Sequence, residues 1–286
     1  MNLTKQQFDL LRSLAEGDTG GVAGSPAEAD LTVKGLLRGG CITDEGRAAL
    51  EPYRVRRMII IAAGYGSRLR PITINTPKPM VRVHGVRIID SLLDAAVAAG
   101  IEDIVLVRGY LGEQFDQLLT KYPNLRFVEN PRYREANNIS SVDAVRDLLP
   151  GSYVAEADLL YRNPRLVTRY QYSSNYLGAA ASHTDDWCFH VDEEGCIRQI
   201  AVGGDDCYQM FGLSYWTPED GARLAAHIHE AMDMPDGGRL YWDEVPMRLH
   251  IQEYRVAVRP CRFEDIIEID TFSELKSLDS AYAEET

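Results

Sequence analysis

One stretch of the sequence combines glycine, arginine and lysine in a spacing that suits phosphate binding. It reads AAGYGSRLRP over residues 62–71 and continues as TPKPM over residues 76–80. Gly64 and Gly66 let the backbone come close to a phosphate, and their N–H groups can cradle it. The Arg68 guanidinium offers a planar fork of donors, and Lys78 can place a point charge on a phosphoryl group under attack. We therefore predict a phosphate loop made by Ala62, Ala63, Gly64, Gly66, Ser67 and Arg68.

Two well-known phosphate motifs do not fit this stretch. A dinucleotide-binding loop needs a third glycine where Leu69 stands, and the G-x-x-x-x-G-K-[ST] pattern of a P-loop is absent from the sequence. A plain glycine turn between a strand and a helix is the structural alternative. Arg68 and the Pro-Lys pair that follows favour the phosphate loop over that alternative.

A nucleoside triphosphate needs its charge neutralised, usually by magnesium held on one or two carboxylates. Two aspartates follow strands that we expect from the pattern. Asp158 comes directly after residues 152–157, and Asp270 comes directly after residues 266–269. We expect both side chains at the rim of the sheet where the phosphate loop lies. The alternative for either aspartate alone is to cap the next element.

Aromatic and acidic residues gather in the second half of the chain. All three tryptophans, Trp187, Trp216 and Trp242, lie there, and acidic residues flank two of them. A quaternary ammonium cannot donate conventional hydrogen bonds, so proteins bind it with aromatic faces and nearby carboxylates. The alternative is that these rings belong to the core. We predict a pocket for a cationic head group formed by Trp187, Tyr215, Tyr241, Trp242 and Asp243.

Alternating strand and helix patterns must position these residues. Met58–Ala62 is an uninterrupted apolar run, as expected for a strand that is buried on both faces. Further strands are expected at 104–107, 126–129 and 152–157, and helices at 88–99, 113–121 and 140–148. This order predicts an α/β fold with a mixed, mostly parallel, Rossmann-like sheet flanked by helices. Shorter segments follow: strands at 177–182, 189–191, 197–202 and 213–215, a helix at 218–232, a strand at 266–269 and a final helix.

Residues 1–55 differ from the α/β part, which we expect to occupy residues 56–286. This segment resembles a small winged-helix domain. It has helical spacing after Thr4, a short helix at 31–40, a turn or strand at Cys41–Ile42 and a helix at 44–53. Such domains often bind DNA. Acidic residues slightly outnumber basic ones here, however, so the segment lacks the electrostatic footprint of a DNA reader. We expect a packing or interaction role instead.

Composition limits the classes of partner. The 286 residues carry a formal net charge of −13, which disfavours nucleic acid and anionic lipid as main partners. The five cysteines lack C-x-x-C spacing, and no run of 18 apolar residues occurs. The N-terminus has no signal-peptide pattern, and the six histidines have no convincing ligand spacing. We expect a cytoplasmic protein with reduced thiols and no membrane insertion. The sequence leaves open whether it forms a homo-oligomer.

The phosphate loop resembles the signature of a known superfamily. Residues 64–79 follow the pattern G-x-G-S-R-L-x-P-x-T-x-x-x-P-K-P of the nucleotidyltransferases that activate sugar 1-phosphates and phosphoalcohols. Within it, residues 57–280 look most similar to the bacterial CTP:phosphocholine cytidylyltransferases. The matching motifs are GYLGEQFD at 109–116, NN at 137–138, YVAEAD at 153–158, LYWD at 240–243 and EID at 268–270.

The resemblance implies a reaction and a set of roles. The chain would transfer a cytidylyl group from CTP to phosphocholine, giving CDP-choline and pyrophosphate. Asp158 and Asp270 would hold Mg²⁺, Asn138 would join the nucleotide site, and Lys78, Arg68 and Asp158 would be catalytic. Because the attacking phosphate oxygen is already anionic, no general base is required. The alternatives are an acceptor such as 2-aminoethylphosphonate, another phosphoalcohol or a sugar 1-phosphate and, from a different class, a non-catalytic nucleotide-sensing regulator.

Overall fold

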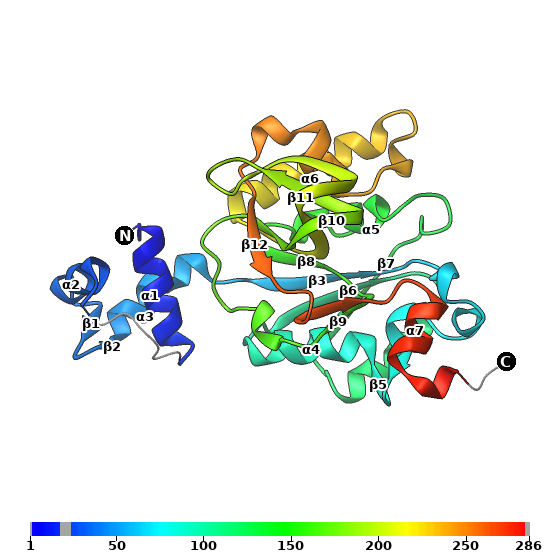
Figure 1. The fold of residues 1–286 in the computed structure, drawn as a ribbon, viewed down its shortest axis with the longest axis horizontal. Helices are drawn as coiled ribbons and strands as arrows, with labels where there is room; N and C mark the ends of the chain where they lie inside the picture. Colours follow the sequence, from blue (N-terminus) through cyan, green and yellow to red (C-terminus); the bar gives the residue numbers. More distant parts are fainter. Residues whose placement is uncertain (1, 18–23, 284–286) are drawn as a thin grey trace. The chain divides into compact units, whose positions relative to one another are not determined.

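The computed structural model describes residues 2–17 and 24–283 (Figure 1). Its contacts divide the chain into two compact units. The first consists of the residues up to Val55 together with the short segment Arg169–Tyr172. The second consists of Arg56–Thr168 and the residues from Ser173 onward. The chain therefore leaves the second unit once, for four residues, and returns to it.

The first unit is mainly helical. Its first helix begins after Thr4, whose side chain accepts from the Gln7 backbone N–H while the Gln7 side chain accepts from the Thr4 N–H. This reciprocal capping box fixes the start that the sequence predicts. A small core includes Phe8, Leu11 and Leu31. The elements are α1 Lys5–Ala15, α2 Pro26–Val33, β1 Leu37–Arg38, β2 Cys41–Ile42, α3 Asp44–Leu50 and the 3₁₀ turn η1 Glu51–Tyr53.

The second helix differs from the expected one at 31–40. It starts earlier because Ser25 caps it and Pro26 occupies its first position, a place where the missing N–H of proline costs nothing. It ends at Val33, and Gly35 then takes a positive φ of 74°. Leu37–Arg38 pairs with Cys41–Ile42 as a short antiparallel ladder instead of continuing the helix. The winged-helix assignment stays a prediction.

Deleting residues 1–54 should leave the nucleotidyl transfer that the resemblance implies within a few-fold of the full chain, since every residue that lines the cavity described below lies beyond residue 56. The deletion also removes the partners of Tyr172, whose ring packs against Phe8 at 5.3 Å and Tyr53 at 5.6 Å. We therefore expect lower solubility, recovered by adding Tyr172→Ser. Steady-state kinetics and light scattering check both points. A folded, soluble truncation that is inactive would contradict the prediction.

A seven-stranded mixed sheet forms the centre of the second unit, which confirms the predicted α/β class. Strands β8, β3, β6 and β7 run parallel to one another, whereas β11 is antiparallel to both β8 and β10. In sheet order the strands are β12 Ala257–Cys261, β10 Asn175–Val191, β11 Ile197–Trp216, β8 Ser152–Glu156, β3 Arg57–Ala62, β6 Asp103–Arg108 and β7 Leu125–Glu129.

Helices cover both faces of this sheet. Figure 1 shows α4 Ile88–Ala98 on one face and α5 Ile139–Asp143 with α6 Pro218–Asp233 on the other. The helix expected at 113–121 is instead a 3₁₀ segment, η5 Gly112–Thr120, and the one expected at 140–148 divides into α5 and the 3₁₀ turn η6 Arg146–Leu148. Among the residues described, no helix is long and apolar enough to cross a bilayer.

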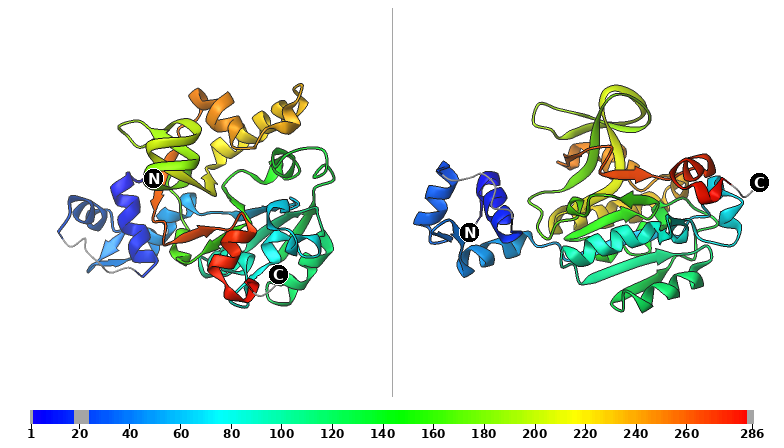
Figure 2. Two further views of the ribbon diagram at one scale, coloured as in Figure 1. Left: turned by 45° about the vertical axis from the view of Figure 1, so that its right-hand side comes forward. Right: turned by 60° about the horizontal axis from the view of Figure 1, so that its bottom comes forward.

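The largest difference from the sequence prediction is the hairpin of β10 and β11. Four short strands were expected, but the structure has two strands of 17 and 20 residues. Polar residues and glycines interrupt the apolar pattern near Thr184 and Gly204, yet these two residues still pair in the ladder. The register shifts between Thr184 and Trp187, which re-aims the side chains that follow. Figure 2 shows the end of this hairpin projecting from the sheet.

A second small sheet brings the two predicted metal ligands together. Strand β9 Leu159–Tyr161 pairs antiparallel with β13 Ile266–Glu268, in the register Leu159 to Glu268. The strand expected at 266–269 therefore exists but lies outside the central sheet. Asp158 precedes β9 and Asp270 follows β13, so antiparallel pairing puts the two aspartates at the same end. The other strands and α-helix of this unit are the hairpin β4 Arg82–Val83 with β5 Val86–Arg87 and the helix α7 Phe272–Leu278.

Candidate active site

A cavity of about 710 Å³ opens at the carboxyl ends of β3 and β8. Parallel sheets commonly bind ligands at this edge. The structure brings every predicted nucleotide-binding residue to the cavity wall, including Asn138, which lies far from the loop in sequence. The lining residues of that set are Ala62, Ala63, Gly64, Gly66, Ser67, Arg68 and Asn138.

The phosphate loop follows β3 directly, and its shape depends on Gly66. This residue has φ of +58°, and a Cβ there would come within 2.8 Å of the Lys78 Cβ. Glycine is thus required both for the backbone conformation and for the approach of Lys78. The Thr73 hydroxyl donates to the Gly66 carbonyl at 2.8 Å and fixes the turn. The loop and Lys78 are therefore built as one unit.

Lys78 lies between the two predicted metal ligands. Its side chain is 10% exposed, and its Nζ lies 2.8 Å from Asp158 Oδ2 and 2.6 Å from Asp270 Oδ1. Arg68 pairs with the other oxygen of Asp270 at 2.7 Å. Burial lowers the pKa of Lys78, but the two carboxylates outweigh this effect and raise the pKa overall. The ammonium group therefore stays charged at neutral pH.

Glu268 joins these aspartates, although the sequence analysis did not name it as a ligand. Asp158, Glu268 and Asp270 each offer an oxygen within 4.8 Å of the others. Asp158 Oδ1 is buried and lacks a hydrogen-bond partner among the residues described. Burial, followed by repulsion from Asp158 and Asp270, raises the pKa of Glu268 to about 8. Three crowded carboxylates of this kind suit a hard divalent cation.

Glu156 extends the acidic group toward the other side of the cavity. It ends strand β8 and also lines the cavity. Burial, followed by repulsion from Asp158 and Asp243, raises its pKa well above the usual range. Its Oε1 lies 3.4 Å from Asn138 Nδ2, and Asn138 Oδ1 accepts from the Trp242 backbone N–H at 2.9 Å. Asn138 thus ties the acidic group to the segment that carries Trp242.

Three of the five predicted acceptor residues line the cavity: Trp187, Tyr241 and Asp243. The Trp187 and Tyr241 rings meet edge to face, with centroids 5.8 Å apart and an interplanar angle of 68°. Asp186 lines the cavity beside them. This wall therefore combines aromatic faces with carboxylates, as the sequence pattern predicts.

The other two predicted acceptor residues, Tyr215 and Trp242, belong to the core, and their assignment to the pocket was wrong. Each is 1% exposed, and neither lines the cavity. The Trp242 ring stacks on Tyr176 at 6.1 Å, and Tyr215 packs edge to face on Tyr153 at 5.7 Å. Both rings fill the space between elements, so they position the cavity wall without forming it.

Asp243 is the most unusual group of the acceptor wall. It is 4% exposed, and its Oδ1 is buried without a hydrogen-bond partner in the part of the chain that the structure describes. Burial, with a smaller effect from Glu244, raises its pKa to about 7. A buried carboxylate of this kind is costly unless it receives a donor or a cation. A donor or a cation beside Asp243 would lower that cost.

Asn130 and Tyr133 are lining residues that the sequence analysis missed. Asn130 follows β7 and donates from Nδ2 to the Ser140 and Ser141 hydroxyls, each at 3.0 Å. Tyr133 packs on Tyr65 of the phosphate loop, with centroids 5.6 Å apart. The end of a strand is the only signal that could have indicated Asn130. Nothing in the sequence distinguishes Tyr133 from the chain's other tyrosines.

The raised pKa of Asp243 predicts a pH-dependent stability. Between its ordinary value of 3.8 and about 7, the folded chain holds a proton that the unfolded chain releases. The free energy of unfolding should therefore fall as pH rises through this window, by up to about 1.4 kcal/mol per pH unit from this group. Asp243→Asn should make the fall shallower in urea unfolding at pH 5, 6 and 7. An unchanged slope, equal to that of the exposed control Asp185→Asn, would contradict it.

Comparison with known proteins gives a family for this geometry. Residues 57–172 match the model of the family described as "Nucleotidyl transferase". A 2-aminoethylphosphonate cytidylyltransferase of Lancefieldella rimae is 40% identical over 78% of this chain and 92% of its own length. A choline-phosphate cytidylyltransferase of Streptococcus pneumoniae is 33% identical over 78% of this chain and 96% of its own length.

A solved structure extends the likeness to the fold. The CTP:phosphocholine cytidylyltransferase of Streptococcus pneumoniae superimposes with a TM-score of 0.74 and 31% sequence identity. The match covers 80% of this chain and 99% of that structure. The matched part of this chain thus corresponds to nearly the whole of that enzyme.

Proposed function

We propose, from the premise that this chain belongs to the nucleotidyl transferase family, that it transfers the cytidylyl group of CTP to 2-aminoethylphosphonate and releases pyrophosphate. The observation that carries the proposal is the buried Asp243 carboxylate, which lacks a partner among the described residues and lines the same cavity as the phosphate loop. The acceptor has an anionic group at one end and a primary ammonium at the other. The anionic end suits the side of the cavity that carries the phosphate loop, and the ammonium end suits the side that carries Asp243.

The reaction that we propose is an in-line displacement at the α-phosphorus of CTP. An oxygen of the acceptor's phosphonate attacks, a new phosphorus–oxygen bond forms, and the bond to the β-phosphate breaks. The attacking oxygen is anionic at neutral pH, so no side chain has to remove a proton. Lys78 and Arg68 lie where they can stabilise negative charge on the transferred and leaving phosphates. The loop holds the triphosphate in position for attack.

Magnesium is part of this proposal, with Asp158, Glu268 and Asp270 as the residues that would hold it. The three carboxylates and the unpartnered Asp158 Oδ1, noted above among the described residues, fit an oxygen-binding cation. Bound there, Mg²⁺ would neutralise charge on the triphosphate. Lys78, which pairs with Asp158 and Asp270 in the structure, has a flexible stem that can turn its ammonium group to a phosphate.

A primary ammonium fits the acceptor wall better than a trimethylammonium group. It can donate hydrogen bonds to Asp243 and to the neighbouring carboxylate of Glu156, whereas a quaternary ammonium has no hydrogen to donate. A charged donor to a carboxylate contributes more than a neutral hydrogen bond does. The 40% identity to a 2-aminoethylphosphonate cytidylyltransferase supports the same choice.

Phosphocholine is the second candidate acceptor, and it is favoured by a different observation. The edge-to-face pair of Trp187 and Tyr241 offers aromatic faces to a methylated cation. The likeness to the choline-phosphate cytidylyltransferase of Streptococcus pneumoniae supports it as well. The phosphocholine assignment made from the sequence stays a prediction.

A pyrophosphate-release assay tests the proposal. CTP and UTP are each combined with 2-aminoethylphosphonate, phosphoethanolamine, phosphocholine and glucose 1-phosphate in the presence of Mg²⁺. We expect the highest kcat/KM for CTP with 2-aminoethylphosphonate. A higher value for phosphocholine would establish the second candidate, and one for glucose 1-phosphate would overturn both. Nucleotide binding without turnover of any acceptor would favour the non-catalytic regulator.

A further inference from the structure

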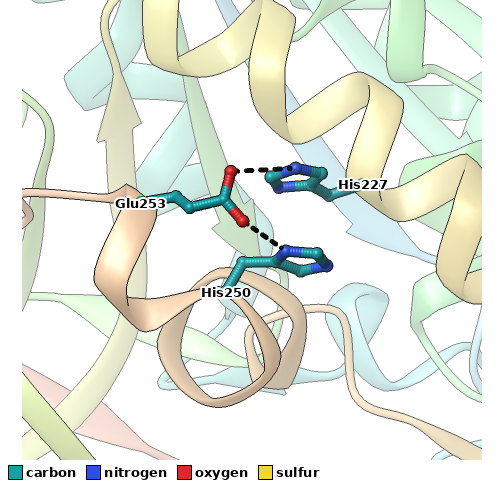
Figure 3. A group of neighbouring side chains, drawn as sticks. All are labelled: His227, His250 and Glu253. Carbon is teal, nitrogen blue, oxygen red and sulfur yellow. Dashed lines mark hydrogen bonds and ion pairs between the residues drawn. The ribbon is translucent and has the colours of Figure 1, made fainter.

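Two histidines and a glutamate meet outside the cavity (Figure 3). His227 lies on α6, and His250 and Glu253 lie in the segment that follows the π-helical turn Val245–Leu249. The Glu253 carboxylate reaches both imidazoles: Oε1 lies 2.9 Å from His250 Nδ1, and Oε2 lies 3.6 Å from His227 Nε2. The three residues form one cluster although 26 positions separate the first from the last. None of the three lines the cavity of the candidate active site.

The environment of His227 directs one ring nitrogen toward Glu253. The side chain is only 13% exposed. Its Nδ1 lies 2.8 Å from the hydroxyl of Tyr254, and Tyr254 is 5% exposed. When an ion takes the place of a proton on Nε2, Nδ1 carries the ring proton and can donate it to this hydroxyl. A histidine whose second nitrogen is held in this way has the usual arrangement of a metal ligand.

We propose that His227 Nε2, His250 Nδ1 and a Glu253 oxygen form a binding site for a divalent transition-metal ion of the zinc class. All three ligand atoms lie within 4.8 Å of one another. Ligand atoms around a tetrahedral zinc ion, with bonds of about 2.0–2.1 Å, are separated by about 3.3 Å. Each histidine nitrogen lies near this distance from one Glu253 oxygen, at 2.9 Å from Oε1 for His250 and 3.6 Å from Oε2 for His227. Two imidazoles and one carboxylate also leave a fourth position open to water.

Binding requires one local movement. The two imidazoles are stacked, with centroids 3.7 Å apart and planes within 10° of parallel. Lone pairs in parallel planes cannot converge on one ion, so one ring has to tilt. His250 is the more exposed of the two at 22%, and it follows the last residue of the π-helical turn. Its ring can tilt while Tyr254 holds His227.

The ligand types select the class of ion. Imidazole nitrogen suits zinc, copper, nickel and cobalt, whereas magnesium and calcium prefer sites made of oxygen alone. The bound ion would tie α6 to residues 250–253. That segment follows closely on Tyr241 and Asp243, which line the active-site cavity. The site would thus brace the acceptor wall from outside the cavity.

Zinc titration of the full-length, untagged chain tests the proposal. The protein is first stripped with a chelator and then titrated by calorimetry in a large excess of Mg²⁺, which occupies sites made only of carboxylates. We expect one Zn²⁺ per chain and a higher unfolding midpoint, because the ion binds only the folded chain. Absence of binding under these conditions would overturn the site.

Variants separate this site from others. His250→Gln should weaken binding by more than about 100-fold, since even loss of an outer partner of a ligand costs about 10–100-fold. Tyr254→Phe keeps all three ligands and should cost about 10–100-fold. His229→Gln is the matched control, because His229 lies on the same helix with its side chain 55% exposed and should not change affinity. Wild-type affinity in both His250→Gln and Tyr254→Phe would refute the site.

A Co²⁺ spectrum identifies the ligand atoms. Asp192, Glu194 and Cys196 form another group of potential ligands, and Cys196 would give a sulfur-to-metal charge-transfer band. We expect that band to be absent and the spectrum of Cys196→Ser to equal that of the parent chain. A strong sulfur band that disappears in Cys196→Ser would assign the ion to that group and overturn the histidine site.

Discussion

Lys78→Met is expected to lower kcat for nucleotidyl transfer by about 100- to 1,000-fold, the range found when a preorganised charge-stabilising donor is removed. The Lys78 ammonium is buried, stays charged and lies beside the loop that we propose binds the triphosphate. Methionine keeps an unbranched side chain of similar length and removes only the charge. A coupled pyrophosphate assay at saturating CTP, acceptor and Mg²⁺ measures the loss.

Folding and binding controls make this result specific. Removing Lys78 leaves Asp158 and Asp270 without their buried counter-charge, so the unfolding temperature should fall as well. Activity is therefore compared well below that temperature. Lys121→Met is the matched control, since Lys121 pairs with Asp94 at the surface and is 48% exposed. Near-wild-type kcat in a folded Lys78→Met chain would remove Lys78 from the mechanism.

The loop residues that line the cavity could be predicted from the sequence because they lie close together in it. Gly64, Gly66, Arg68 and Lys78 lie within 15 positions, and they follow an apolar run that can only be a buried strand or helix segment. Asp158 and Asp270 are more than 100 positions apart. They could still be predicted because each follows a strand. The pairing of β9 with β13, which brings them together, has no signature in either strand alone.

The acidic residues that were not identified as ligands share a pattern with those that were. Glu156 stands two positions before Asp158, and Glu268 stands two positions before Asp270. Each glutamate is the last residue of its strand, and the aspartate that follows it lines the same cavity. That repeated Glu-x-Asp pattern is the signal that could have predicted the full carboxylate group.

The aromatic residues show where sequence reasoning reaches its limit. Residue type alone does not distinguish a ring that lines a cavity from one that fills the core. A shift of one position in strand register moves a side chain to the opposite face, and the β10–β11 ladder shifts between Thr184 and Trp187. Trp187 consequently lies in the cavity wall. Trp242 lies outside any strand, where no periodicity could predict its burial against Tyr176.

Asp243→Asn is expected to lower kcat/KM for 2-aminoethylphosphonate by about 10- to 150-fold, the equivalent of losing a hydrogen bond to a charged group worth about 1.5–3 kcal/mol. The same variant should affect phosphocholine far less, because a trimethylammonium group donates no hydrogen bond to the carboxylate. Trp187→Ala should show the reverse preference, with a larger loss for phosphocholine than for 2-aminoethylphosphonate. It should cost phosphocholine about 2- to 30-fold, for a cation–π contact of about 0.5–2 kcal/mol.

The specificity constants of both acceptors are measured with both variants at pH 8, where Asp243 is mostly ionised. Dividing each by the value of the parent chain gives four ratios. Asp185→Asn serves as the control, since that carboxylate is on the same hairpin as Trp187 but is 99% exposed. If Asp243→Asn lowers the constants of both acceptors equally, its carboxylate supports the fold or the nucleotide and does not contact the ammonium group. A larger loss for the primary ammonium alone would mean that Asp243 selects it through charge and hydrogen bonding, because the aromatic pair is unchanged in that variant.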